Sequence, residues 1–488
     1  MSSAPPQPGD FIQRGLKPPP AACSTVRLKS EMNSRYLWCV ALVSALGGFL
    51  FGYDWVVIGG AKPFYEAYLG ITQPSREAWA MSSALVGCLA GAVSSGWLSE
   101  QIGRRRALLI SAAFFATSAL GTGMATTFIG FVVWRIAGGT AIGMASGLSP
   151  IYIAEIAPAE SRGKLVCLNE LTIVLGILAA QTVNWLVARP VPLGSSLLDI
   201  QASWNGQIAW RRMFEAAVVP ATAFLVGVYF IPESPRWLAR QGHWERAKHV
   251  LVRFGGENHA VRTMDEMRAS FHAETHSSVG AALRNPRLLP VLGIGVTLAV
   301  LQQWCGINVI FNYAQEVFSA AGYALSSILF NIVITGVVMC VFTFVAIATV
   351  ERLGRRRLML LGCASLAILY VILGGLYFTK QRGLPLLVLV VTALACYAMT
   401  LAPITWVILS EIFPNEVRGA CMAICTTALW AACFMLTYTF PLLNSSLGTA
   451  RTFWIYAAVC AVGFLFVLRY LPETKQKTLE EIQQAWHV

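Results

Sequence analysis

The chain has 488 residues, of which 56% are hydrophobic and 12% are charged, and its formal net charge is +12. Soluble domains carry about 25% charged residues, so this composition excludes a water-soluble globular protein. A helix that spans a bilayer uses about 20 apolar residues, and the chain is long enough for a dozen such helices. The positive charge would suit a nucleic-acid binder, but Lys and Arg in membrane proteins usually mark the cytoplasmic side.

The N-terminal segment 1–36 is polar and rich in proline, and we expect it to be a disordered cytoplasmic tail. It does not resemble a cleavable signal peptide, because the first apolar stretch starts only near Leu37. Most of the 12 cysteines lie inside apolar stretches and lack the spacing of a disulfide framework or a metal site. We therefore interpret them as small core residues.

Long apolar runs bounded by charged or Pro/Gly-rich segments predict twelve membrane-spanning helices. They cover residues 37–59, 78–99, 107–126, 129–151, 165–188, 213–231, 289–318, 325–350, 358–378, 385–410, 420–443 and 452–470. The long polar interior segment shows helical spacing, which predicts short amphipathic helices. We expect an all-α membrane protein with one six-helix bundle over 37–231 and a second over 288–470. An intracellular helical segment over 232–287 would lie between them. A cytoplasmic C-terminal helix is expected within 471–488, where TLEE at 478–481 is typical of a capping box.

Most of the Lys and Arg residues lie on one side of this predicted topology. They fall in the N-terminal tail, after the second and eighth spans, in the 232–287 segment and near the end of the last span. The positive-inside rule makes that side cytoplasmic, and an even number of spans then places both termini there. The basic charge is explained by topology, so we expect a lipid bilayer and no nucleic acid as partner.

Three sequence patterns occur once in each half of the chain. GRRR at 103–106 returns at 354–357, AEIAPAESRG at 154–163 returns as SEIFPNEVRG at 410–419, and PES at 232–234 has a looser counterpart in PET at 472–474. The spacing between the copies is nearly equal, which indicates two related six-span halves. Duplicated halves are typical of secondary transporters, whose substrate site lies between the repeats near the middle of the bilayer.

The repeated patterns place charged residues at the cytoplasmic ends of equivalent spans. These residues are Arg104, Arg105, Glu155, Arg162, Arg355, Arg356, Glu411 and Arg418. Opposite charges shared between the two bundles could form ion pairs that exist only while the cytoplasmic side is closed, which predicts a cytoplasmic gate. The alternative is simple anchoring of the spans by basic residues.

Charged residues inside the predicted spans are rare. Asp54 lies late in the first span and Arg135 early in the fourth, which runs in the opposite direction, so we expect both in the outer third of the bilayer. A carboxylate that alternates between a protonated and an Arg-paired state is what a proton-coupled carrier needs. A permanent structural ion pair is the alternative. Glu170 in the fifth span is a second ionisable candidate.

The seventh span carries four amides near a helix-breaking glycine, Gly306. They are Gln302, Gln303, Asn308 and Asn312. Amides both donate and accept hydrogen bonds, which suits a polyhydroxylated ligand such as a sugar. Polar contacts between helices are the alternative. No Ser/His/Asp, metal-ligand or phosphate-binding pattern is found, so we expect neither an enzyme nor a cofactor.

Together these strings resemble the sugar porter family of the major facilitator superfamily. The resemblance covers residues 37–482 and rests on GGFLFGYD (47–54), both GRRR copies, SPIYIAEIAPAESRGKL (149–165), PESPRWL (232–238), QQWCGIN (302–308), SEIFPNEVRG (410–419) and LPETK (471–475). It implies two six-helix bundles that rock about a central sugar site, with the 232–287 segment forming intracellular helices.

The resemblance also assigns roles to individual residues. In proton-coupled members of the family an aspartate at the position of Asp54 pairs with an arginine that matches Arg135, whereas facilitative members carry asparagine there. Gln302, Gln303, Asn308, Tyr313, Phe51 and Trp430 match the sugar contacts of the family. The chain departs from the family pattern at four positions: Glu170 replaces a usual glutamine, Leu401 a tryptophan of the tenth helix, Leu429 a glutamine before Trp430 and Asn312 a common tyrosine.

We therefore expect a proton-coupled symporter of a monosaccharide or polyol that works by alternating access. It would lie in a plasma membrane or bacterial inner membrane and function as a monomer. Two alternatives remain open: a facilitative uniporter in which Asp54 is structural, and a membrane sugar sensor without net transport. A sensor of this architecture would be expected to carry a long cytoplasmic signalling tail.

Overall fold

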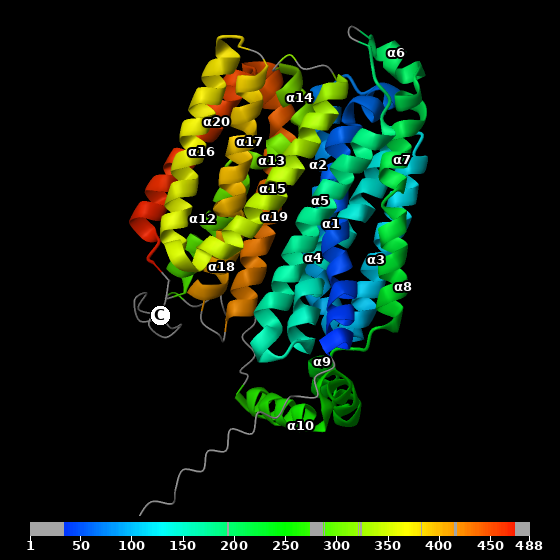
Figure 1. Cartoon of the computed structure of the whole chain (residues 1–488), viewed down its shortest axis with the longest axis vertical. Helices are drawn as coiled ribbons and strands as arrows, with labels where there is room; N and C mark the ends of the chain where they lie inside the picture. Colours follow the sequence, from blue (N-terminus) through cyan, green and yellow to red (C-terminus); the bar gives the residue numbers. More distant parts are fainter. Residues whose placement is uncertain are drawn as a thin grey trace, which may run out of the picture.

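The computed structural model describes residues 34–473, apart from 193–194, 274–285, 287, 321, 323–324, 382 and 414–416. These residues form helices that are gathered into two bundles lying side by side (Figure 1). Within these described residues, twelve helical segments are long and apolar enough to cross a membrane, which confirms the predicted number of spans. The predicted N-terminal tail and the predicted helix at 478–481 lie outside the described residues.

The N-terminal bundle contains the first six spans. Its helices are α1 (Ser34–Leu69), α2 (Pro74–Ile102), α3 (Arg104–Met124), α4 (Phe128–Ile156), α5 (Ala159–Val187), and a sixth span built from the π-helical turn η1 (Asn205–Ala209), α7 (Trp210–Glu215) and α8 (Val218–Phe230). A short helix, α6 (Leu197–Ala202), precedes the sixth span at the upper end in Figure 1.

The C-terminal bundle contains the other six spans, two of which are interrupted. Its helices are α12 (Leu289–Trp304), α13 (Ile307–Asn312), α14 (Ala314–Ala320), α15 (Leu325–Leu353), α16 (Arg355–Phe378), α17 (Leu384–Met399), α18 (Leu401–Ile412), α19 (Arg418–Leu447) and α20 (Thr449–Tyr470). The seventh span breaks at Gly306, which has a left-handed conformation with a φ of 84°. The tenth span, predicted as one helix, breaks at Thr400, just before Pro403, which lacks an N–H to donate.

Helices α9 (Pro235–Arg240) and α10 (Trp244–Ala273) lie below the N-terminal bundle, which confirms helices within the polar segment (Figure 1). Ser234 caps α9, because its Oγ accepts a hydrogen bond from the N–H of Trp237 at 3.2 Å. Helix α10 is kinked at Gly255 and Gly256. We refer to this end of the molecule as the α9–α10 end and to the opposite end as the α14 end.

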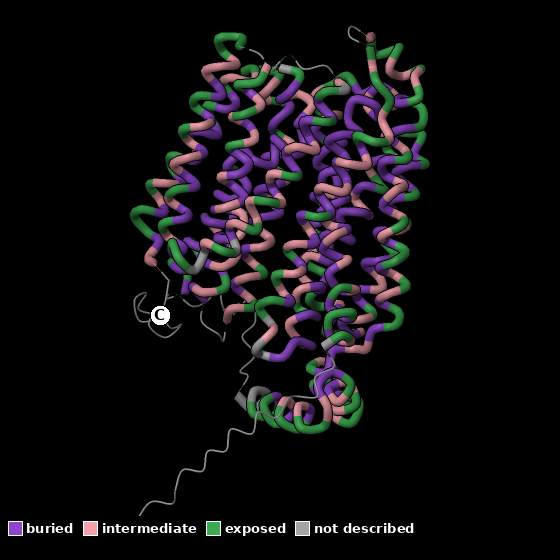
Figure 2. Tube along the Cα trace, viewed as in Figure 1, coloured by how far each residue is buried: buried purple, intermediate pink, exposed green. Residues whose placement is uncertain are grey.

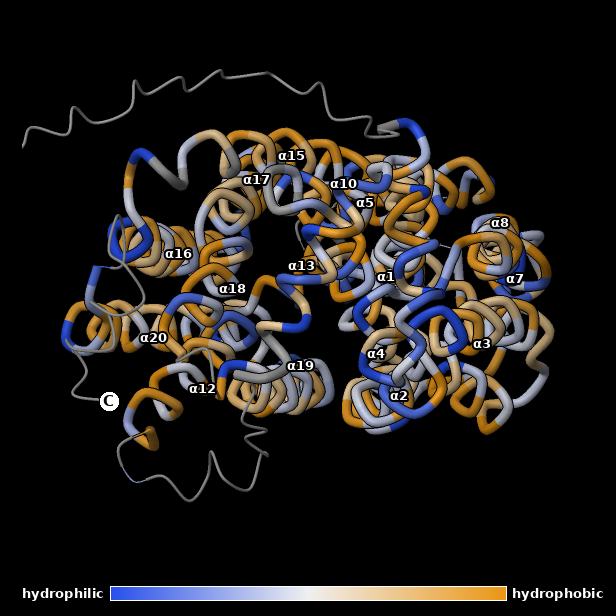
Figure 3. The backbone as a smooth tube through the Cα atoms, turned by 90° about the horizontal axis from the view of Figure 1, so that it is seen from below, coloured by the Kyte–Doolittle hydropathy of each residue, from blue (hydrophilic) through white to orange (hydrophobic). Residues whose placement is uncertain are grey.

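Apolar side chains cover the outer faces of the bundles as well as their interior. Figure 2 shows buried residues concentrated inside each bundle, and Figure 3 shows hydrophobic residues on the outward-facing helix surfaces. Exposed large side chains such as Ile129, Val219 and Phe230 would be costly in water. They are suited to contact with lipid tails, as expected of a multi-pass membrane protein.

Glycines allow α2 and α4 to pack with their backbones almost in contact. A Cβ at Gly87 or Gly91 of α2 would lie 2.0 or 2.2 Å from a backbone oxygen of α4, and one at Gly139 or Gly143 of α4 would lie 1.7 or 2.1 Å from a backbone oxygen of α2. Both pairs have the small-xxx-small spacing of close membrane helix packing. This contact fixes α4 in the bundle, and with it Arg135.

Gly87→Ala should therefore destabilise the protein, because the new methyl group must push α2 and α4 apart. Overpacking of this kind costs about 1–3 kcal/mol, which should lower the melting temperature in detergent by several degrees. Gly96→Ala is the matched control, since Gly96 also lies in α2 but a Cβ there meets nothing within 4 Å. Equal melting temperatures for the two variants would contradict this packing.

Candidate functional site

Asp54 of α1 and Arg135 of α4 form a buried ion pair inside the N-terminal bundle. Arg135 Nη1 donates to Asp54 Oδ1 at 2.9 Å, and the two residues are only 2% and 6% exposed. The predicted pairing is thus present. Helix α1 continues to Leu69 instead of ending at residue 59, so Asp54 lies nearer the middle of its helix than predicted.

The ion pair is made through one carboxylate oxygen only. Asp54 Oδ2 is buried and has no hydrogen-bond partner among the described residues. Gly138 of α4 leaves space beside it, because a Cβ there would lie 3.2 Å from Oδ2. A buried carboxylate oxygen without a hydrogen-bond partner is costly in an apolar interior.

Three of the four predicted amides form a chain around the break between α12 and α13. Gln302 Nε2 donates to the carbonyl of Ala402 at 3.1 Å, and Gln303 Nε2 donates to Gln302 Oε1 at 3.1 Å. Asn308 Nδ2 in turn donates to Gln303 Oε1. The αL conformation of Gly306 turns the chain so that residues on both sides of the break converge. Asn312 is also buried but does not share these bonds.

Aromatic side chains from both bundles meet beside α1. The ring of Trp430 of α19 lies 5.9 Å from that of Phe51 and 5.8 Å from that of Trp55. Trp430 Nε1 is buried and has no hydrogen-bond partner among the described residues. The structure therefore brings two predicted site residues together across the bundle interface and adds Trp55, which periodicity alone did not distinguish from a packing residue.

Two predicted site residues lie apart from this cluster. Tyr313 is fully buried, donates to the carbonyl of Thr437 at 2.7 Å and packs against Phe440, so in this structure it acts as a support. Glu170 of α5 is exposed. It lies three helical turns before Gln181, on the same face of α5. Gln181 Nε2 reaches Thr335 Oγ1 of the other bundle at 3.4 Å, so this face of α5 points toward the bundle interface.

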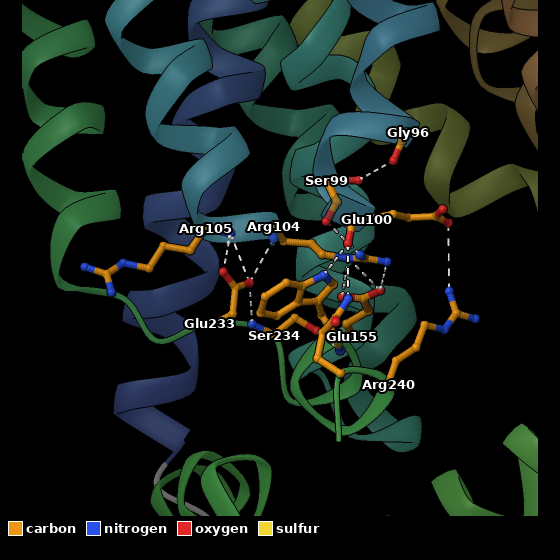
Figure 4. Close-up of polar contacts among 11 residues, drawn as sticks. Gly96, Ser99, Glu100, Arg104, Arg105, Glu155, Glu233, Ser234 and Arg240 are labelled. Carbon is orange, nitrogen blue, oxygen red and sulfur yellow. Dashed lines mark hydrogen bonds and ion pairs between the residues drawn. The ribbon is translucent and has the colours of Figure 1, made fainter. Parts of the chain in front are cut away.

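Arg104 and Glu155 pair at the α9–α10 end of the N-terminal bundle, 3.1 Å apart (Figure 4). Glu233, from the segment after α8, caps α3: its carboxylate accepts hydrogen bonds from the backbone N–H groups of Arg104 and Arg105 at 2.9 and 3.1 Å. Burial raises the pKa of Glu233, opposed by these hydrogen bonds. A carboxylate at a helix N-terminus is stabilised by the helix dipole.

The second half repeats this arrangement. Arg355 of α16 pairs with Glu411 of α18 at 3.0 Å, and Glu473 accepts from the backbone N–H of Arg355 at 2.9 Å. Arg356 donates to the carbonyl of Leu468 and Arg418 to the carbonyl of Phe413. The side chain of Arg162 lies outside the described residues.

The pairs Arg104–Glu155 and Arg355–Glu411 each join helices of a single bundle. We predicted ion pairs between the two bundles, but these two ion pairs lie within a bundle. The Arg and Glu residues do pair with each other, as the duplicated motifs implied. A pair within one bundle holds that bundle together whether or not the two bundles are in contact.

Two features escaped the sequence reasoning. Glu233 and Glu473 cap α3 and α16; the recurrence of PES at 232–234 as PET at 472–474 indicated related halves, but it did not reveal this capping role. Lys62 is buried against three glutamates, and it was overlooked because the predicted first span stopped before it.

The chain is similar to characterised transporters over nearly its whole length. A sequence model of the Sugar (and other) transporter family matches residues 40–486. The D-xylose-proton symporter of Escherichia coli K12 is 36% identical, with 94% of this chain and 97% of the symporter covered. The arabinose-proton symporter of Bacillus subtilis is 36% identical, with 92% and 94% covered.

The fold is also that of a solved transporter. The inward open conformation of the xylose transporter XylE from E. coli aligns with a TM-score of 0.80 at 35% identity, covering 92% of this chain and 100% of XylE. The fold is therefore the one expected of the major facilitator superfamily, and the chain is a transporter protein and not an enzyme. The chain belongs to the Sugar (and other) transporter family.

Proposed function

We propose that this protein is a proton-coupled symporter of a monosaccharide or polyol. The observation that carries the proposal is the buried Asp54–Arg135 pair, whose second carboxylate oxygen is unpaired among the described residues. The relatives named as xylose-proton and arabinose-proton symporters support it. We further propose a bacterial inner membrane as its location, with the α9–α10 end and both termini in the cytoplasm, and a monomer as the working unit.

The proton would bind at Asp54 Oδ2. Protonation removes the negative charge that holds Arg135, so the ion pair weakens to a neutral hydrogen bond and α1 gains freedom relative to α4. Loss of the proton restores the pair and leaves neither charge unpaired. In the protonated state Arg135 keeps a buried charge with no counter-charge from Asp54, and an isolated buried charge costs several kcal/mol. The protonated state therefore favours a rearrangement around Arg135 or release of the proton.

The sugar would bind at the amide chain of α12 and α13. Gln302, Gln303 and Asn308 bond to one another and to a backbone carbonyl, and a sugar hydroxyl can replace any of these partners because it both donates and accepts. Phe51 and Trp430 provide apolar surface for a sugar face from the two bundles. Glu170 would add a carboxylate contact, and Asn312 and Tyr313 would complete and support the site.

Transport would follow from rocking of two rigid bundles, 37–231 and 288–470, about this site. The TM-score of 0.80 with an inward open XylE supports the idea that the two bundles are apart at the α9–α10 end in this structure. In the opposite state the charges of Arg104, Glu155, Arg355 and Glu411 would exchange partners across the bundle interface and form the predicted gate. Arg105, Arg162, Arg356 and Arg418 would supply further contacts there.

A facilitative uniporter is the second candidate within the same family, with Asp54–Arg135 as a permanent ion pair. A sensor without net transport is the third. Counterflow separates the sensor, which binds sugar but exchanges none, from both carriers. Proton flux then separates the symporter from the uniporter.

Asp54→Asn should abolish proton-driven accumulation and leave exchange. Asparagine keeps the size of the side chain and can accept a hydrogen bond from Arg135, but it cannot take up a proton. In proteoliposomes we expect sugar-dependent proton uptake to fall at least tenfold, with labelled-sugar counterflow retained. Glu215→Gln, which removes the half-buried i,i+3 partner of the exposed Arg212, is the control. Unchanged accumulation in Asp54→Asn would refute the role of Asp54.

Asn308→Ala should weaken sugar binding about tenfold, because a hydrogen bond of about 1–1.5 kcal/mol is lost. A panel of sugars and polyols followed by thermal shift measures this directly. Gln207→Ala, an amide that bonds to the carbonyl of Gln201 at the α14 end, should bind as wild type. In the same panel Glu170→Gln should change the ranking of ligands. Identical ligand responses in all three variants would exclude this site.

Glu155→Gln should slow exchange and leave the sugar dissociation constant unchanged, because Glu155 lies at the gate and not at the sugar site. We expect the maximal counterflow rate to fall at least fivefold. Glu100→Gln is the control, since Glu100 lies at the same end in an exposed pair with Arg240 at 3.8 Å. An equal effect of both substitutions would argue against a specific gate.

A further inference from the structure

Lys62 of α1 is buried at the α14 end and is surrounded by carboxylates from three helices. Its side chain is 3% exposed, and its Nζ lies 3.4 Å from Glu66 of α1 and 2.9 Å from Glu77 at the start of α2. Nζ also donates a hydrogen bond to Glu316 of α14. The ring of Tyr313 lies 5.6 Å from Nζ. We call Lys62, Glu66, Glu77 and Glu316 the Lys62 cluster.

The cluster joins the two bundles. Lys62, Glu66 and Glu77 belong to the N-terminal bundle, whereas Glu316 belongs to the C-terminal bundle. An ion pair of this kind can persist only while the two bundles are in contact at the α14 end. It differs in this respect from Arg104–Glu155 and Arg355–Glu411, which remain whole when the bundles separate.

The backbones of the two bundles also meet next to the cluster. A Cβ at Gly59 of α1 would lie 2.6 Å from the carbonyl oxygen of Phe311 and 3.2 Å from that of Asn312, both in α13. Glycine is therefore required for α1 and α13 to approach this closely. This contact lies one helical turn before Lys62, so steric fit and charge act at the same place.

The cluster holds more carboxylates than one ammonium can neutralise. The side chains of Glu66, Glu77 and Glu316 are 15%, 24% and 20% exposed. They therefore reach the surface, whereas Lys62 does not. If Glu316 moves away, Lys62 keeps two carboxylates of its own bundle. Breaking the cross-bundle pair therefore leaves no bare buried ammonium, and the usual high cost of separating a buried ion pair is avoided.

We infer that the Lys62 cluster is a charge-exchange lock that closes the α14 end, with Glu316 holding the bundles together and Glu66 and Glu77 competing for the same ammonium. Lys62 bonds to Glu316 when this end is closed and is retained by Glu66 and Glu77 when it opens. The inference rests on the proposed transport by alternating access, in which the α14 end must open for sugar to enter. The two roles predict opposite effects of similar substitutions.

Glu316→Gln removes the cross-bundle charge and should favour the state open at the α14 end. Glu77→Gln removes a competitor, strengthens the pair between Lys62 and Glu316, and should favour the closed state. Neither substitution strips Lys62 of its carboxylates, so both variants should fold. We expect each to change the ratio of open to closed molecules at least fivefold, in opposite directions.

Hydrogen–deuterium exchange of the whole protein in nanodiscs, without sugar, measures this ratio. Glu316→Gln should raise exchange in α13, α14 and the end of α1 and lower it in the helix ends at the α9–α10 end, and Glu77→Gln should do the reverse. Glu215→Gln, which removes a carboxylate at the same end from a pair within one bundle, should match wild type. Shifts in the same direction for Glu316→Gln and Glu77→Gln, or no shift in Glu316→Gln, would overturn the lock.

Gly59→Ala provides a test that changes no charge. Its methyl group would separate α1 from α13, so exchange should shift in the same direction as in Glu316→Gln, and a shift toward the closed state would contradict the inference. The readout uses neither sugar nor a proton gradient. A failure of the lock would therefore leave proton symport standing, and a failure of proton symport would leave the lock measurable.

Discussion

Charge buried in a membrane-spanning bundle must be neutralised. The ion pair of Asp54 with Arg135 meets this requirement, and the rest of the structure depends on it. Each ion alone would cost several kcal/mol in the apolar interior, and removing one partner of such a pair costs about 3–5 kcal/mol. The carboxylate therefore has two acceptable states, paired with Arg135 or protonated. A helix bundle that must satisfy one of these two states can couple proton binding to the position of α1.

The scaffold serves to place these two charges against each other. Glycines at the α2–α4 contact bring the helix backbones together, and Gly52 and Gly176 do the same for α1 and α5, where a Cβ would lie 1.9 or 2.0 Å from a backbone oxygen. Arg135 and Asp54 thus sit on helices that are each packed tightly against a neighbouring helix of the same bundle. The amide chain of α12 and α13 lies in the other bundle, so the proposed sugar site and the proposed proton site belong to different bundles.

Much of this arrangement could be predicted from the sequence. Bilayer thickness sets the length of an apolar run that can cross a membrane, and runs of that length predicted the spans. Because charged residues are scarce within these spans, Asp54 and Arg135 could be identified as candidates. The break at Thr400 could not be seen, because its flanking residues are apolar and a single Pro is tolerated in membrane helices. Lys62 was missed for a related reason: α1 continues past it to Leu69, since three carboxylates allow a Lys to be buried where hydropathy would end the span. Whether Arg104 and Arg355 pair within or between bundles depends on the conformational state, which a sequence does not specify.

Proton coupling is measured most directly by the size of the sugar gradient that a known pH gradient can balance. In proteoliposomes clamped at zero membrane potential, one proton carried with each sugar predicts that net sugar flux vanishes when a tenfold sugar gradient opposes a proton gradient of about one pH unit. A flux that vanishes only when sugar concentrations are equal, whatever the pH difference, would show a uniporter and contradict the coupling role of Asp54.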